Sequence, residues 1–292
     1  MKIQTECVPC LLKRILFEAE LSTSDVNRQT DALRTACSVL AKLYDPGVCS
    51  ATIATQVHQA VYKALGDKDP YRTLKHQSNT IAATLVSKVE SLLKNSQDRL
   101  KTSMVCSIIG NILDFGIDGS SATPQMLQEV FDRLYVEGLG HDDYEHLRKL
   151  IRKAKRVVLF TDNCGEIVFD KILCRELKAV NPAVHLTVVV KGESILSDAT
   201  MTDAEEISLH EVVDEVLTTG CYAVGVDFAR LPLNVKIALD HVDLIIVKGM
   251  ANYESFSETS YRPIAYLLRT KCNAIARSLH LPRNISAIKL VE

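Results

Sequence analysis

Apolar positions in the first half of the chain recur at helical spacing. In residues 24–44 the apolar side chains that share one helical face are Val26, Leu33, Cys37, Leu40 and Leu43. Ser24 and Asp25 precede this pattern as an N-cap region, because short polar side chains can accept hydrogen bonds from the first turn. No strand pattern precedes about residue 155, so the first half is predicted to be helical, with helices at 24–44, 53–65, 71–93, 103–115 and 124–134.

The second half contains short runs of β-branched and aliphatic residues. Strands buried on both faces are predicted at 156–161, 185–190 and 243–248, and another strand is predicted to end within 212–217. Residues 286–291 alternate between polar and apolar and are predicted to form an edge strand. Helices are predicted between the strands, at 167–179, 235–239, 261–269 and 274–279.

Strands that alternate with helices indicate a parallel sheet with helices on both faces. The predicted fold is therefore α/β, a three-layer α/β/α Rossmann-like domain with a mostly parallel sheet, preceded by a helical N-terminal region. The pattern changes from helical to α/β near the polar stretch 140–143. We therefore assign residues 1–150 to the helical region and 151–292 to the α/β domain.

Composition excludes several classes of function. The formal net charge is -2, with basic and acidic residues interspersed, which gives no electrostatic case for nucleic acid or an anionic membrane. No segment approaches the roughly 20 apolar residues of a membrane span, and the first residues lack the pattern of a signal peptide. A cytoplasmic protein is expected, in which the nine scattered cysteines form no disulfide framework.

Polar side chains follow three of the predicted strands. The carboxyl ends of parallel strands meet at one sheet edge, where open α/β sheets bind their ligands. The residues concerned are Asp162, Asn163, Gly165, Glu166 and Asp170 after the strand at 156–161, Lys191, Asp198 and Asp203 after the strand at 185–190, and Lys248, Gly249, Asn252 and Glu254 at the end of and after the strand at 243–248.

Asp162, Asn163 and Asp198 supply the ligand types of a hard cation. Mg²⁺ and Mn²⁺ prefer carboxylate and carbonyl oxygens, with waters and substrate phosphate completing the shell. Each residue alone could be a helix cap or turn residue. Their placement at one predicted edge favours a divalent-metal site.

The other residues at this edge suit a phosphate ester. Lys248 could neutralise phosphate charge, Gly249 would let the backbone approach the ligand, and Asn252 could donate to an oxygen. Glu166 and Asp203 are candidate general acid or base groups, although either could cap a helix instead.

Familiar motifs of other enzymes are absent from the sequence. No GxGxxG follows the first strand, and there is no GxxxxGK[ST] and no GxSxG. Cys7 and Cys10 form a CxxC at the start of a helix. A zinc site would need two further ligands, and a redox site would expect a preceding strand, so both stay open as alternatives.

These segments resemble the metal-dependent damage-control phosphatases, a family that includes proteins once described as acidic-residue methyltransferases. The resemblance rests on residues 162–170, 191–204 and 248–254. The prokaryotic, largely archaeal branch is the most similar, because it also carries an N-terminal CxxC and segments like 69–71 and 110–115. Residues 165, 249, 252 and 254 fall within these signatures, so Gly165 and Glu254 join Lys248, Gly249 and Asn252 in the predicted substrate-binding set.

The resemblance implies a metal held by Asp162, Asn163 and Asp198, with Mg, Mn, Co or Ni as the ion. It also implies hydrolysis of small phosphorylated metabolites, such as sugar phosphates or damaged phospho-metabolites. Ser197 departs from the family pattern, in which Asn is common, and this should alter hydrogen bonding around the ligands.

Two mechanisms and two other functions stay open. Hydrolysis could use a metal-activated water, with Glu166 or Asp203 moving the proton and Lys248 stabilising charge, or an aspartyl phosphate on Asp162. The second route lacks the usual further aspartate, because position 164 is Cys164. The alternatives are an S-adenosylmethionine-dependent carboxyl methyltransferase and a non-catalytic metal- or metabolite-binding module.

Overall fold

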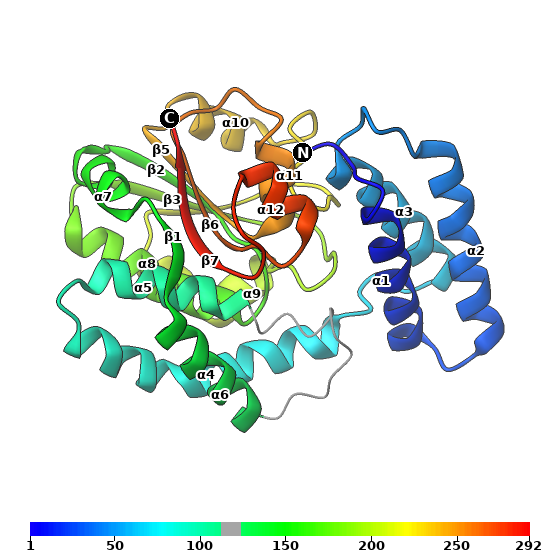
Figure 1. The fold of residues 1–292 in the computed structure, drawn as a ribbon, viewed down its shortest axis with the longest axis horizontal. Coiled ribbons are helices and arrows are strands. Elements are labelled where there is room, and N and C mark those ends of the chain that lie inside the picture. The colour runs from blue at the N-terminus through cyan, green and yellow to red at the C-terminus, as the bar shows by residue number, and fades with distance from the viewer. Residues whose placement is uncertain (112–123) are drawn as a thin grey trace.

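The computed structural model describes residues 1–111 and 124–292. One sheet lies at the centre with helices on both faces, and three N-terminal helices stand beside it as a bundle (Figure 1). The predicted α/β fold with a mostly parallel sheet is therefore confirmed. Residues 112–115 of a predicted helix lie outside the described residues.

Within the described residues, the sheet has seven strands in the order β1-β7-β6-β5-β2-β3-β4. The neighbouring pairs are parallel except β6 with β7. Strands β2, β3 and β5 are buried along almost their whole length, as their apolar sequences predict. The bounds are β1 Leu139–Asp142, β2 Arg156–Phe160, β3 His185–Val190, β4 Glu215–Thr218, β5 Leu244–Lys248, β6 Ile264–Arg269 and β7 Ser286–Val291.

The helices mostly follow the predicted pattern. Asp25 caps α2, because its side chain accepts a hydrogen bond from Asn27 N, and α3 ends at Gly66 with a φ of 66°. A 3-10 turn, η2, spans Leu209–Glu211. The α-helices are α1 Cys7–Ser22, α2 Val26–Leu43, α3 Ser50–Leu65, α4 Arg72–Asn95, α5 Arg99–Gly110, α6 Pro124–Glu137, α7 Tyr144–Lys153, α8 Glu166–Val180, α9 Met201–Glu206, α10 Leu233–Asp240, α11 Met250–Phe256 and α12 Asn273–Leu279.

Three predictions about single elements were wrong. The helix predicted at 261–269 is instead strand β6, which pairs with β5 and β7, because a short apolar run fits a buried strand as well as a helix. Strand β1 lies before residue 155, but with four residues and alternating burial it gives little signal. Residues 286–291 do form a strand, yet β7 lies between β6 and β1 rather than at the edge.

The helices of the first half pack in two places. Helices α1, α2 and α3 pack on one another around a core that includes Ile15, Ala36 and Val57. Helix α5 instead packs against the sheet, where Leu100, Met104 and Ile108 share one core with sheet residues such as Leu159 and Val188. The division of the chain at residue 150 stays a prediction, and α5 belongs to a layer of the α/β core.

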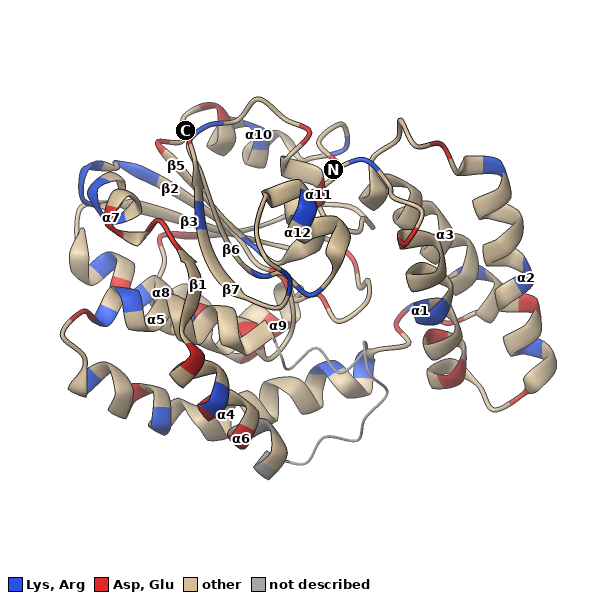
Figure 2. Cartoon of the chain, in the orientation of Figure 1, with Lys and Arg blue, Asp and Glu red and all other residues tan. Residues whose placement is uncertain are grey.

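The outer surface carries charges of both signs. Figure 2 shows Lys and Arg positions interspersed with Asp and Glu positions along the helices. Within residues 1–111 and 124–292, no helix is long and apolar enough to cross a membrane.

We expect Ile108→Ala to lower the free energy of unfolding by about 2–5 kcal/mol, because it leaves a cavity between α5 and the sheet. Urea denaturation followed by circular dichroism measures the change. The matched control is Ile237→Ala on α10, where the side chain is 48% exposed and the change should stay within about 0.5 kcal/mol. An equal, small loss for both variants would contradict the placement of α5 in the core.

Candidate functional site

Three polar segments meet at the carboxyl edge of the sheet. Strands β5, β2 and β3 are adjacent and parallel, so the residues that follow them leave the sheet on the same side. These are the segments that the sequence placed together. Their convergence is a finding of the structure, whereas the roles of the individual residues stay predictions.

Backbone hydrogen bonds join the segments after β2 and β3. Asn163 and Asp198 form an isolated antiparallel bridge, flanked by hydrogen bonds from Cys164 N to Ser197 O and from Ala199 N to Asp162 O, both 2.8 Å. The two chain segments are thereby held side by side. Asp162, Asn163 and Asp198 are consequently neighbours, although 35 sequence positions separate Asn163 from Asp198.

Side-chain hydrogen bonds and an ion pair then orient the three residues. Ser197 Oγ donates to Asn163 Oδ1 at 2.8 Å, and Asn163 Nδ2 donates to Asp162 Oδ2 at 2.7 Å. Asp198 Oδ2 lies 3.2 Å from Lys191 Nζ. Ser197, where the resembling family commonly has Asn, thus hydrogen-bonds to one of the predicted metal ligands.

The donor set fits a hard divalent cation in chemistry. Two carboxylates and one amide oxygen, each at most 6% exposed, are all-oxygen ligands of the kind that Mg²⁺ and Mn²⁺ prefer. Among the described residues, no three or more His, Cys, Asp or Glu side chains are grouped so as to hold a metal ion. A metal here would therefore depend on Asn163 as well as on the two carboxylates.

Lys248 is fully buried among acceptors of the protein itself. Its ammonium group donates to Glu166 Oε1 and Asp170 Oδ1, both at 2.6 Å, and to Ser107 O at 3.3 Å. An ammonium group has three hydrogens, so these three acceptors use all of them. The sequence expected Lys248 to neutralise a phosphate, whereas the structure gives it the place of a buried counter-ion.

The ionisation of this cluster follows from its burial. Burial raises the pKa of the Asp170 carboxyl to about 6, against the lowering effect of Lys248. Burial alone would lower the pKa of Lys248, but Asp170 and Glu166 outweigh it and raise that pKa above its ordinary value. Lys248 therefore stays charged at neutral pH.

Asn111 links this cluster to Asp162. Its Nδ2 donates to Glu166 Oε2 at 2.6 Å and to Asp162 Oδ2 at 2.9 Å. Lys271, half-buried and placed after β6, donates to Asn111 O at 2.7 Å. The end of α5 thus contributes to the site from the helical half of the chain.

Asp203 caps a helix. Its Oδ2 accepts from Thr200 N at 2.8 Å and from Thr200 Oγ1 at 2.7 Å, which forms a capping box at α9. Its Oδ1 accepts from Asn79 Nδ2 at 3.1 Å. Asn79 Oδ1 in turn accepts from Gly165 N at 2.6 Å. Of the two readings that the sequence left open, this geometry favours the cap.

Asn252 also has a structural place. Its Nδ2 donates to Thr161 O at 2.8 Å and to Lys248 O at 2.9 Å, which ties α11 to the ends of β2 and β5. Its Oδ1 accepts from Lys191 Nζ at 3.2 Å. Both amide hydrogens are used within the protein, so Asn252 orders the sheet edge rather than presenting a donor to a ligand.

Gly249 lies directly against Asp162, and Glu254 lies elsewhere. A Cβ at Gly249 would come within 2.0 Å of Asp162 Oδ2, and the φ of 76° also favours glycine. Glu254 is not brought to this edge. Its carboxyl lies by Ser50 and the N-terminal amine, and burial raises its pKa to about 7.

Several residues of the site had no assigned role in the sequence. Asn111 and Lys191 lie within or beside segments that carried the family resemblance, so that signal was present. Asn79, Lys75 and Lys271 follow no strand-end pattern, because the first two project from α4 and Lys271 follows a strand that was predicted as helix.

Comparisons with known proteins agree along almost the whole chain. Residues 3–284 match a family model described as the damage-control phosphatase ARMT1-like domain. A damage-control phosphatase of Archaeoglobus fulgidus is 37% identical over 292 residues, which is 100% of each chain. One of Pyrococcus horikoshii is 30% identical over 283 residues, covering 97% of this chain and 96% of the relative.

A solved structure shares the fold. The crystal structure of a DUF89 family protein from Pyrococcus horikoshii superposes with a TM-score of 0.90 at 28% sequence identity, covering 100% of both chains. Family model, relatives and fold agree with the resemblance that the motifs indicated. The chain therefore belongs to the damage-control phosphatase ARMT1-like domain family.

Proposed function

We propose that this protein is a divalent-metal-dependent phosphatase that hydrolyses phosphate monoesters of small metabolites, and that Asp162, Asn163 and Asp198 hold the metal. The relatives from Archaeoglobus fulgidus and Pyrococcus horikoshii are named damage-control phosphatases, which supports the phosphatase activity. The structural observation that supports a bound metal is the net charge of a cluster of buried ionisable side chains at the sheet edge.

That cluster contains more carboxylates than ammonium groups. Each member is at most 7% exposed, and if all are ionised, five negative charges against three positive ones leave an excess of two. Uncompensated charge in a protein interior is strongly unfavourable, so this excess suits a divalent cation. The members are Asp162, Glu166, Asp170, Asp198 and Asp203 on one side, and Lys75, Lys191 and Lys248 on the other.

A bound Mg, Mn, Co or Ni ion would supply Lewis acidity to the phosphoryl oxygens and to an attacking water. The protein supplies proton transfer and orientation. We assign the proton-transfer role to Glu166, whose carboxylate shares the donor Asn111 with Asp162. Lys248 acts as a positioning residue, because it fixes the other oxygen of Glu166.

Charge on the transferred phosphoryl group calls for a cation close to the proposed metal ligands. Lys248, Lys191 and Lys75 are buried among protein acceptors. Lys271 is half-buried and its ammonium lies beside Asn111, one residue from the metal-binding set. Because Lys271 lies beside Asn111, which contacts Asp162, we assign it stabilisation of the equatorial oxygens, the role first predicted for Lys248.

We expect Asp198→Asn to weaken Mn²⁺ binding by more than about 100-fold, because it removes a charged ligand rather than an orienting neighbour. Calorimetric titration with MnCl₂ measures binding, and p-nitrophenyl phosphate hydrolysis measures the accompanying loss of kcat/KM. Asp240→Asn, at an exposed position on α10, is the control and should change neither. Undiminished Mn²⁺ affinity in Asp198→Asn would sink the ligand assignment.

We expect Lys248→Met to lower the free energy of unfolding by about 3–5 kcal/mol, because Glu166 and Asp170 would be left buried without a counter-ion. Urea denaturation at neutral pH measures this. Adding Asp170→Asn should restore part of the loss. The control Lys149→Met, at an exposed position on α7, should stay within about 0.5 kcal/mol. A lysine that served the substrate alone would lose activity with its stability intact.

A further inference from the structure

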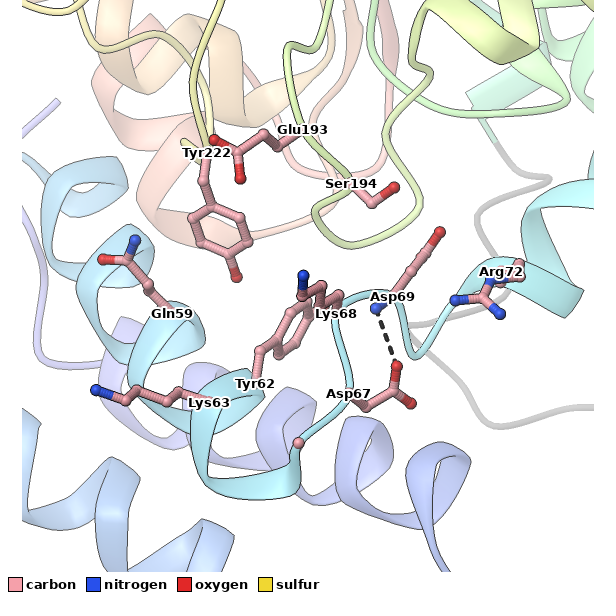
Figure 3. A pocket seen from close by; sticks show the side chains of 11 residues that line it. Gln59, Tyr62, Lys63, Asp67, Lys68, Asp69, Arg72, Glu193, Ser194 and Tyr222 are labelled. Atoms are coloured by element: carbon pink, nitrogen blue, oxygen red, sulfur yellow. Dashed lines mark hydrogen bonds between the residues drawn. The ribbon is translucent and has the colours of Figure 1, made fainter.

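A cavity of about 760 Å³ lies between the N-terminal helix bundle and the loops that follow β3 and β4. This volume is within the range of small-molecule sites, roughly 300–1,000 Å³. Figure 3 shows that its walls come from the end of α3, the connection to α4, and the residues Glu193, Ser194 and Tyr222. None of the predicted site residues lines it.

Tyr222, which lines this cavity, has a buried and unused hydroxyl. The side chain is 6% exposed, and among residues 1–111 and 124–292 its hydroxyl has no hydrogen-bond partner. Burial raises the pKa of this phenol far above its ordinary value, so the hydroxyl stays protonated and can donate. A buried hydroxyl without a partner costs about 1–3 kcal/mol, which a ligand oxygen would relieve. In Figure 3 the ring points between α3 and the loop that carries Lys68.

The neighbouring tyrosine connects the cavity to the loop that carries Asp198. Tyr62, whose ring meets Tyr222 edge-on at a centroid distance of 5.8 Å, accepts a hydrogen bond from Leu196 N at 3.3 Å. Ser194, four residues before Asp198, lines the cavity itself. One loop therefore forms both a wall of the cavity and part of the candidate metal site.

Helix α4 makes the same connection from the other side. Arg72, Lys75 and Asn79 follow one another at helical spacing and so share one face of α4. Arg72 lines the cavity, Lys75 Nζ lies 3.4 Å from Ser194 Oγ, and Asn79 contacts Gly165 N and Asp203. One face of α4 thus runs from the cavity wall at Arg72 to Asn79, which contacts the segments that carry the proposed metal ligands.

The charges of the lining indicate what the cavity would accept. Three cationic and three acidic side chains line it, so it has no net charge and gives no preference for a second anionic group. Gln59 and the tyrosine hydroxyls add neutral hydrogen-bonding groups. This combination suits an uncharged, hydroxyl-bearing group better than a second phosphate or an apolar chain.

We propose that this cavity receives the organic part of the phosphate monoester, and that Tyr222 is a specificity-determining residue that hydrogen-bonds a hydroxyl of that group. The proposal rests on the proposed function for the position of the phosphate. The cavity is a binding site separate from the proposed metal ligands, none of which lines it. Tyr222 acts in substrate selection and does not take part in the chemical step.

The test compares Tyr222→Phe with the unmodified protein on two esters in the presence of Mn²⁺. A hexitol 6-phosphate carries hydroxyls, whereas p-nitrophenyl phosphate has none beyond its phosphate. We expect kcat/KM for the hexitol phosphate to fall about three- to tenfold, mainly through KM, as for the loss of one neutral hydrogen bond. The p-nitrophenyl phosphate values should stay within twofold.

The matched control is Tyr266→Phe, which removes a buried phenol from the core at β6 and should leave both esters unchanged. Calorimetric binding of the hexitol 6-phosphate in EDTA repeats the comparison without turnover, and a hexitol bisphosphate tests the charge argument.

An equal effect of Tyr222→Phe on both esters, unchanged binding, or much tighter binding of the bisphosphate would overturn the proposal. Hydrolysis of neither ester would instead contradict the proposed function, and the binding comparison would then decide on the cavity alone.

Discussion

The buried ion pairs of Lys248 with Glu166 and Asp170 hold the site together. Lys248 ends β5, both acids lie on α8, and Ser107 of α5 accepts the third hydrogen and also donates to Asp170 at 2.6 Å. Three elements thereby converge on one ammonium group. Buried ion pairs contribute little net stability, so the main effect of these pairs is to fix one arrangement of the three elements. Here that arrangement places Glu166, and through Asn111 also Asp162, at the sheet edge.

Much of this edge could be predicted from the sequence. The β-branched runs of β2, β3 and β5 identify buried parallel strands, and parallel strands must bring their carboxyl ends together. The convergence of Asp162, Asn163 and Asp198 follows from that rule. The contacts of the Lys248 side chain do not follow from it. A lysine at the end of a strand looks the same in a sequence whether its side chain contacts a ligand or two acids on a neighbouring helix.

The contributions of the first half could not be predicted in the same way. Asn79 lies on α4 and Asn111 directly follows α5, and their partners are more than 50 positions away in the chain. Strand β6 shows the same limit, because the apolar run IAYLLR has no period that separates strand from helix. Its pairing with β5 and β7 settles the matter, and that pairing is a property of the whole sheet.

The position of β7 has a consequence for biosynthesis. Strand β1 joins the sheet through β7, so residues 139–142 find their partner in residues 286–291. A ribosome that has completed the first half has therefore made a strand whose partner does not yet exist. Because β1 has only four residues and alternates between half-buried and exposed positions, it leaves few unpaired backbone groups and little apolar surface before β7 is made. Closure of this side of the sheet is thus a late event in the life of the nascent chain.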